Sequence, residues 1–383
     1  MRFGIGFNFC NYTDWDRFLA LERGEEVGPM AIGDDQVIGE QLALADLAEP
    51  LGFDTLWAFE QHAAPFLMTP DPTQYLSYFA GRTSTINVGS MITVLPWHNP
   101  IRLAEQISML QHFLGGRKYY LGVGRGLARR NFEAMGVSMD EARERFNEVL
   151  DVLQLAFTEE MFSYRGEFFE YENVSVRPRP LNAETVIDAW GSWTSEASLE
   201  NMGRRGLHPL TSSNATLESY LKDLVVLDEV RAANGYGPAE RPILQIPLYC
   251  AESASEAREG AEKFFREWVT SILNMYEIGT DRFANAKGYE QYTTKGSDFG
   301  SGSSESAVQT LTDKFLDVGV VGTPEECAEK IVFHHESMNP QELVFVSGAG
   351  SMNGAEAEKS LRLLAEKALP LVEHVRREPA PVG

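Results

Sequence analysis

Apolar residues along the chain switch repeatedly between the period of a strand and the period of a helix. Phe3, Ile5 and Phe7 occupy alternate positions and predict a first strand over residues 2–8. After this strand the apolar residues repeat at helical spacing, and the helix that they predict ends at Gly52. The same rhythm predicts strands over 54–59, 86–95, 118–123, 186–190, 208–211, 243–251 and 343–346, and helices over 73–83, 100–114, 139–158, 195–203, 215–234, 257–268 and 361–368.

This alternation of strands and helices is typical of a parallel sheet covered by helices. About eight such units can be counted, which favours a closed α/β (β/α)8 TIM barrel over an open doubly wound sheet. No GxGxxG sequence follows the first strand, so the usual dinucleotide-binding signature is missing. Residues 162–176 alternate around Gly166 and predict a β-hairpin inserted into the barrel.

Two segments lack either period. Residues 10–34 are expected to form a long first loop, and residues 275–308 are rich in glycine, serine and tyrosine. Loops of this length in compact domains are usually functional, so we interpret 275–308 as a mobile lid in preference to a linker. We therefore expect one domain over residues 1–375 and a C-terminal tail over 376–383.

Charge and composition exclude several functions. The formal net charge of −23 argues against binding to nucleic acid or to an anionic membrane surface. No segment approaches the roughly 20 apolar residues of a membrane span, and the N-terminus does not resemble a signal peptide, so we expect a cytoplasmic protein. The three cysteines are far apart and suggest neither a metal site nor a redox pair.

Polar residues collect where barrel strands are expected to end, which is where such barrels place their working groups. Arg125 stands in a glycine-rich turn after the fourth strand, and Ser192 and Ser195 follow the fifth, before a helix. Glycines, hydroxyls, a helix N-terminus and a guanidinium together suit a phosphate group. Alternatively, Ser195 only caps its helix and Arg125 pairs with a surface carboxylate. Trp190 is either a wall of this cofactor cavity or part of the core.

Glu60 and His62 follow the second strand and should point to the same side, with Gln61 opposed. They could form an acid–base pair, because histidine titrates near neutral pH. Alternatively, they are buried polar residues bonded to nearby backbone. His334 and His335 lie on a helix away from any strand end, and we expect them to be solvated.

Several segments resemble the flavin-dependent bacterial luciferase-like monooxygenases. GFDTLWAFEQH ends a strand in glutamate near histidine, and a Gly-Tyr…Lys-Gly…Asp-Phe run resembles the mobile loop of the luciferase catalytic subunit. The matching segments are 52–62, 86–106, 114–137, 288–299 and 321–331, and the resemblance extends over residues 1–375. Gln61 stands where luciferase has its catalytic histidine and Gly124 where it has a reactive cysteine, so the resemblance implies the scaffold and leaves luciferase's aldehyde chemistry open.

The resemblance implies an FMN site. Arg125 would grip the phosphate, aided by Ser192 and Ser195. Met91 and Ile92 would underlie the isoalloxazine ring, at a position where the family often has a non-prolyl cis peptide. For catalysis the resemblance implies Glu60 as the pocket glutamate. We assign His62 to control protonation of the peroxide or substrate, and Glu60 to orient it.

The implied reaction is two-component oxygenation. A separate flavin reductase would supply reduced FMN, and O₂ would form a C4a-peroxyflavin that oxygenates a small, mostly apolar organic substrate. A homodimer or a heterodimer is also implied, and we expect the homodimer. Two alternatives remain: a deazaflavin-dependent dehydrogenase or reductase on the same fold, and a non-catalytic flavin-binding partner subunit.

Overall fold

A computed structural model describes residues 1–212, 216–283, 285–293 and 304–376. Its parallel strands close into an eight-stranded barrel, because β8 pairs with β9 and so joins the two ends of the sheet. Around the barrel the strands are β1 (Arg2–Phe7), β2 (Thr55–Ala58), β3 (Asn87–Val94), β4 (Tyr119–Gly124), β7 (Trp190–Gly191), β8 (His208–Ser212), β9 (Ile243–Cys250) and β11 (Glu342–Ser347). A short parallel strand, β10 (Val320–Gly322), extends the sheet beside β9.

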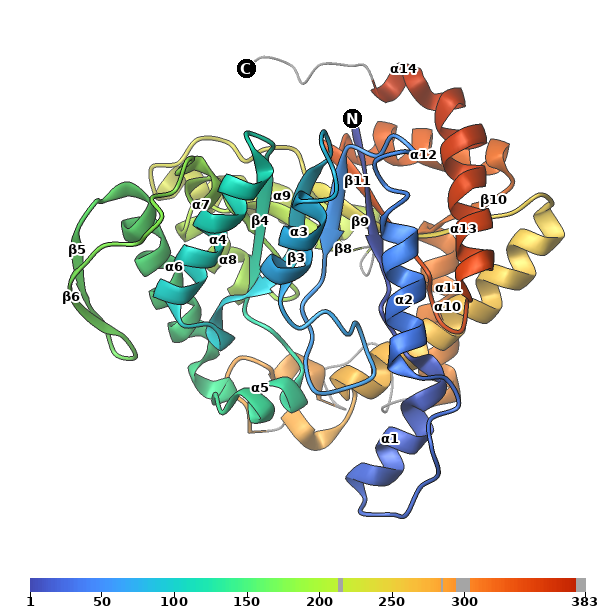
Figure 1. Ribbon diagram of the computed structural model, residues 1–383, viewed down its shortest axis with the longest axis horizontal. Helices are drawn as coiled ribbons and strands as arrows, with labels where there is room; N and C mark the ends of the chain where they lie inside the picture. Colours follow the sequence, from blue (N-terminus) through green and yellow to red (C-terminus); the bar gives the residue numbers. More distant parts are fainter. Residues whose placement is uncertain (213–215, 284, 294–303, 377–383) are drawn as a thin grey trace.

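Helices cover the outside of the barrel (Figure 1). The α-helices are α1 (Trp15–Glu22), α2 (Asp34–Ala45), α3 (Pro72–Ala80), α4 (Pro100–Leu114), α5 (Arg129–Met135), α6 (Ala142–Thr158), α7 (Glu184–Ile187), α8 (Glu196–Arg204), α9 (Leu217–Ala233), α10 (Ala254–Tyr276), α11 (Glu305–Val318), α12 (Pro324–Met338), α13 (Gly354–Leu363) and α14 (Glu373–Arg376). Shorter helical turns span Tyr12–Asp14, Leu95–Trp97, Met139–Glu141, Asp281–Phe283, Glu290–Tyr292, Leu364–Ala368 and Leu369–Val372.

The amino end of the barrel is closed by packed side chains. The indole N–H of Trp57 donates to Glu342 Oε1 at 2.7 Å, and Arg2 pairs with the same carboxylate at 2.8 Å. Gly4 leaves room for this contact, since a Cβ there would lie 2.3 Å from Glu342 Oε1. A ligand therefore has to approach from the opposite end.

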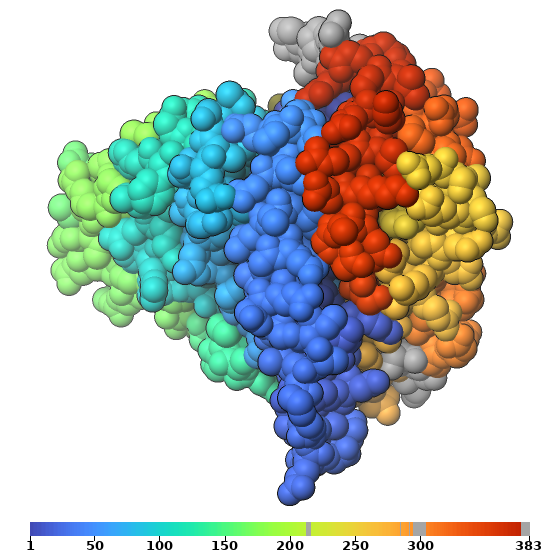
Figure 2. All heavy atoms as spheres, turned by 45° about the vertical axis from the view of Figure 1, so that its right-hand side comes forward, coloured from blue at the N-terminus to red at the C-terminus, as the bar shows by residue number. Residues whose placement is uncertain are grey.

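The two ends of the barrel carry different elements (Figure 1). The N-terminus lies close to α14, where the amino group of Met1 donates to the carbonyl of Val375 at 2.9 Å. The strands run away from this end, and α1 and α5 lie at the other. Figure 2 shows the α1 region protruding there from the body of the molecule. The carboxyl ends of the strands are thus the end at which long connections gather.

The predicted barrel and the inserted hairpin are confirmed. The hairpin consists of β5 (Phe162–Arg165) and β6 (Glu170–Val174), paired antiparallel. The helix predicted over 100–114 has the bounds of α4, because Asn99 caps it and Pro100 opens it. Thr323 begins α12 with a capping box, in which its side chain accepts from the N–H of Glu326 and the Glu326 side chain accepts from the N–H of Thr323.

Three expectations were wrong. Residues 10–34 contain α1, in which Trp15, Phe18 and Leu19 do follow helical spacing and pack against the core, so the prediction overlooked a short apolar period. The strand predicted over 186–190 is instead α7 followed by the two-residue β7, since Val186 is buried from a helix. His334 is buried, with Nε2 2.8 Å from the carbonyl of Val318, and burial lowers its pKa to about 4.

Residue 284 and residues 294–303 of the lid predicted over 275–308 lie outside the described residues. The two ends of this prediction were also wrong, because residues 275–276 belong to α10 and residues 305–308 to α11. In the described part of the chain, no helix combines the length and apolar character needed to cross a membrane.

Candidate functional site

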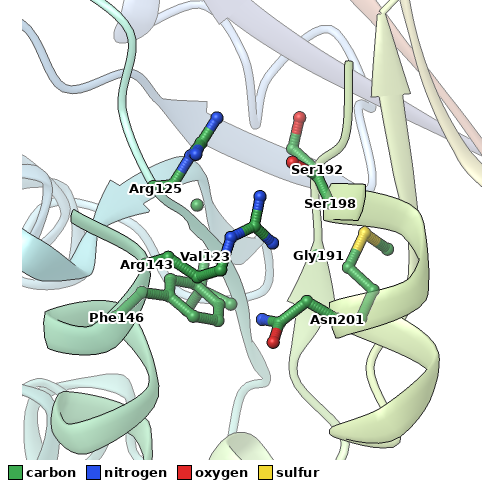
Figure 3. Close-up of a pocket in the computed structure, with 10 residues that line it drawn as sticks. Val123, Arg125, Arg143, Phe146, Gly191, Ser192, Ser198 and Asn201 are labelled. Atoms are coloured by element: carbon green, nitrogen blue, oxygen red, sulfur yellow. The ribbon is translucent and has the colours of Figure 1, made fainter. Parts of the chain in front are cut away.

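A polar pocket lies between the end of β4 and the start of α8 (Figure 3). Its residues come from β4, α6, β7 and α8 and the turns that follow the two strands. Two guanidinium groups stand on one side, and hydroxyl and amide groups stand on the other. We call it the two-arginine pocket, and it is lined by Val123, Gly124, Arg125, Arg143, Phe146, Gly191, Ser192, Ser198, Asn201 and Met202.

Arg125 lies just past β4, as the sequence predicted, and does not pair with a surface carboxylate in the described structure. Its Nη2 donates to the carbonyl of Gly288 at 2.8 Å, and its guanidinium carbon lies 3.9 Å from the centre of the Tyr289 ring. Because these partners are neutral, the positive charge of the guanidinium is not balanced by them and can attract an anion. The segment that carries Gly288 and Tyr289 belongs to the predicted lid and touches the pocket directly.

The second cation of the pocket is Arg143, in the first turn of α6. It donates to the carbonyl of Ala197 at 2.7 Å. Burial and the charge of Arg125 both lower its pKa. Two like charges beside one cavity, with no acidic side chain among the lining residues, fit an anionic group such as a phosphate.

The two predicted serines have different positions. Ser192 lines the pocket, and its backbone N–H donates to the carbonyl of Val123 at 3.2 Å. Ser195 caps α8, since its Oγ accepts from the N–H of Ser198 at 3.3 Å, and it is not among the lining residues. Its place on the lining is taken by Ser198 and Asn201, one turn and two turns further along α8.

The sequence interpretation missed Arg143, Ser198 and Asn201, yet it held signals for them. A cation in the first turn of a helix opposes the helix dipole and so indicates another purpose for Arg143. Ser198 and Asn201 follow Ser195 at intervals of three, which places all three on one face of α8.

Met91 and Ile92 lie in β3, and the peptide bond between them is cis, as the resemblance implied. The pairing of β3 with β4 shifts register between Ser90 and Thr93, across these two residues. Ile92 also lies against the two-arginine pocket, because a Cβ on Gly124 would be 1.9 Å from its Cδ1. Trp190 is buried in β7 with its ring 5.2 Å from that of His208, and does not line this pocket.

Glu60 and His62 do come together, and a third residue joins them. Glu60 is fully buried, and its Oε1 lies 3.1 Å from His62 Nε2 and 2.9 Å from His98 Nε2. Its Oε2 accepts from the N–H of Val94 at 2.7 Å. We call Glu60, His62 and His98 the acid–histidine cluster. Both histidine side chains are about 15% exposed, at 14% and 16%, so the cluster can be reached.

The charges in this cluster stabilise one another. Burial favours the protonated acid, but the charge of His98 and the hydrogen bonds from His62, His98 and Val94 outweigh it and lower the pKa of Glu60. Burial also opposes a charge on His98, yet the Glu60 carboxylate outweighs it and raises the pKa of His98. The cluster is therefore best described as an ionised carboxylate with a protonated partner.

His98 was not predicted as a site residue, although it stands three residues beyond the strand predicted over 86–95. Gln61 is opposed to Glu60 as expected, and it forms a separate network. Its amide donates to the hydroxyl of Tyr276 at 2.6 Å and accepts from Asn131 at 2.5 Å. This network connects the segment after β2 to α10 and α5, at the carboxyl ends of the strands.

The two-arginine pocket and the acid–histidine cluster both lie where the strands of a closed parallel barrel end, which is where barrel enzymes place their active sites. A sequence profile of the luciferase-like monooxygenases matches residues 18–338. The chain therefore belongs to the luciferase-like monooxygenase family, which is a family of flavin-dependent oxidoreductases.

Individual relatives are distant but cover the chain almost fully. The alkanal monooxygenase alpha chain of the Kryptophanaron alfredi symbiont is 24% identical over 358 residues, which is 90% of this chain and 96% of the relative. The oxygenating constituent of 3,6-diketocamphane monooxygenase from Pseudomonas putida, solved with FMN, has a TM-score of 0.71 at 20% identity, covering 97% of this chain and 98% of that one. An F420-dependent secondary alcohol dehydrogenase has a TM-score of 0.67 at 16% identity, covering 97% and 99%. At these identities the two structures establish the shared fold.

Proposed function

We propose that this protein is an FMN-dependent monooxygenase that uses reduced FMN and O₂ to oxygenate a small, mostly apolar organic substrate. The observation that carries the proposal is the two-arginine pocket. Arg125 and Arg143 face one cavity together with Ser192 and the N-terminal turn of α8, and this set of donors suits a phosphate monoester. When bound, reduced FMN supplies the electrons with which O₂ is activated.

Each group of residues has a separate role in this proposal. Arg125, Arg143 and Ser192 hold the phosphate, and Ser195 supports them by capping α8. Met91 and Ile92 would contact the isoalloxazine ring, since Ile92 lies against Gly124, which lines the pocket. Trp190, which is buried in β7, would support the pocket from the barrel core.

His62 accepts or returns a proton at the substrate or the oxygen, and Glu60 fixes the orientation of its ring. The edge of the His62 ring also packs against Trp97, with centroids 5.3 Å apart, which limits its rotation. The lid over 275–308 excludes water from the reaction, because activated oxygen would otherwise be lost to solvent. Tyr289, whose hydroxyl donates to the carbonyl of Gly126 at 3.0 Å, ties part of this lid to the pocket.

The remaining parts of the proposal concern supply and assembly. Reduced FMN comes from a separate flavin reductase, as the alkanal monooxygenase resemblance implies, and the enzyme is a homodimer. We place it in the cytoplasm, where buried free thiols such as those of its three cysteines persist.

A second candidate is a deazaflavin-dependent dehydrogenase, favoured by the likeness to the F420-dependent alcohol dehydrogenase. The two can be separated by anaerobic titration of the protein with FMN, reduced FMN and F420, followed by fluorescence or absorbance. The proposal expects reduced FMN to bind more tightly than F420. Tight binding of F420 with none of reduced FMN would replace it with the dehydrogenase.

A further inference from the structure

The acid–histidine cluster holds one buried anion beside two imidazoles. The Glu60 carboxylate has no exposed surface, and its ion-pair partners within the described residues are His62 and His98. A buried carboxylate without a compensating cation is costly, so one of the two rings has to carry the extra proton. The question is which one.

An ionised Glu60 is the acceptor in each of its hydrogen bonds. The N–H of Val94 can only donate, so Oε2 is an acceptor. Oε1 faces the Nε2 atoms of both histidines, and an ionised carboxylate accepts from both. Each ring therefore has a hydrogen on Nε2, and the two differ only at Nδ1. A neutral ring keeps an acceptor there, whereas a charged ring has a second donor.

The surroundings favour the charge on His98. It lies closer to the carboxylate, at 2.9 Å against 3.1 Å for His62. The titratable groups that face it are Glu60, His62 beyond that carboxylate, and Asp71, which caps the neighbouring α3 and adds a second negative charge. Glu60 and Asp71 both stabilise a positive charge on His98, whereas the carboxylate that His62 contacts is Glu60.

We infer that His98 is a positioning residue, which takes the proton that balances Glu60 and so leaves His62 neutral, with its Nδ1 lone pair available to accept a proton. This inference rests on the proposed function, because it explains how His62 can act as a base beside a buried acid. Without His98, the balancing proton would move to His62 and occupy that lone pair.

The test is ¹⁵N NMR of the histidine-labelled full-length protein at pH 7, which distinguishes protonated from unprotonated ring nitrogens. In the wild type we expect a doubly protonated His98 and a His62 with hydrogen on Nε2 alone; a His62→Asn spectrum identifies the resonance. In His98→Gln, which keeps a neutral donor, we expect His62 to become doubly protonated and the fraction with a free Nδ1 to fall about tenfold. His112→Gln, an exposed change on α4, is the matched control.

A neutral His98 in the wild type, or a His62 that keeps its free Nδ1 in His98→Gln, would overturn the inference. In the same variants, the pH dependence of the rate of flavin reoxidation by oxygen should shift for His98→Gln and remain unchanged for His112→Gln. If reduced FMN does not bind at all, the proposed function fails, while the NMR spectra still decide where the proton resides.

Discussion

Among single residues, the charge of the two-arginine pocket comes from Arg125 and Arg143, which approach it from different elements. Arg125 was found from its place in a glycine-rich turn. Arg143 was not predicted, because it is far in the sequence from any predicted strand end. Only the packing of α6 beside β4 brings it to the pocket. Sequence thus revealed the half of the site that lies next to a strand.

Replacing Arg143 with alanine should weaken the binding of reduced FMN by about 10- to 100-fold, because a charge-assisted hydrogen bond contributes roughly 1.5–3 kcal/mol. Arg145→Ala is the matched control, since Arg145 lies on the same helix but pairs with Glu141 away from the pocket. Anaerobic titration measures both variants. Equal affinities for the two would show that Arg143 does not contact the phosphate.

Among the secondary-structure elements, prediction succeeded where local signals and tertiary packing agree. The bounds of α4 follow from Asn99 and Pro100, and those of the hairpin follow from alternation around Gly166. Prediction failed at β7, where two residues suffice because pairing on both sides holds them in the barrel. It also failed at α1, where the apolar face of Trp15, Phe18 and Leu19 is only two turns long and lies within a polar, glycine-containing segment.

The two serines at the start of α8 provide a test at this scale. Ser195→Ala should lower the free energy of unfolding by about 1 kcal/mol through loss of the cap, with little change in FMN affinity. Ser192→Ala should do the reverse, weakening FMN binding several-fold while leaving stability nearly unchanged. Urea unfolding and FMN titration of both variants measure this. A larger loss of affinity in Ser195→Ala than in Ser192→Ala would return Ser195 to the phosphate site.

For the whole molecule, buried neutral histidines link stability to pH. Burial lowers the pKa of His208 and of His334 to about 4, well below the ordinary value of 6.5. The unfolded chain therefore binds more protons than the folded one between these values, and stability falls as the pH drops from 6.5 toward 4. These residues lie on β8 and α12, so we expect their effects to add.

The free energy of unfolding should thus decrease over this range, by roughly 2–3 kcal/mol for each histidine. His334→Gln, which keeps a donor for the carbonyl of Val318, should show a shallower decline than the wild type. Urea unfolding at a series of pH values measures the slope. The same slope in both proteins would mean that His334 does not stay neutral in the folded state.

The central claim is that the barrel binds reduced FMN and controls its reaction with oxygen. The most direct measurement is rapid mixing of the protein, loaded anaerobically with reduced FMN, against oxygenated buffer while flavin absorbance is recorded. We predict reoxidation that differs in rate and number of phases from that of free FMN, and that reverts toward free behaviour in Arg125→Ala. Reoxidation indistinguishable from that of free FMN in the wild type would contradict the account.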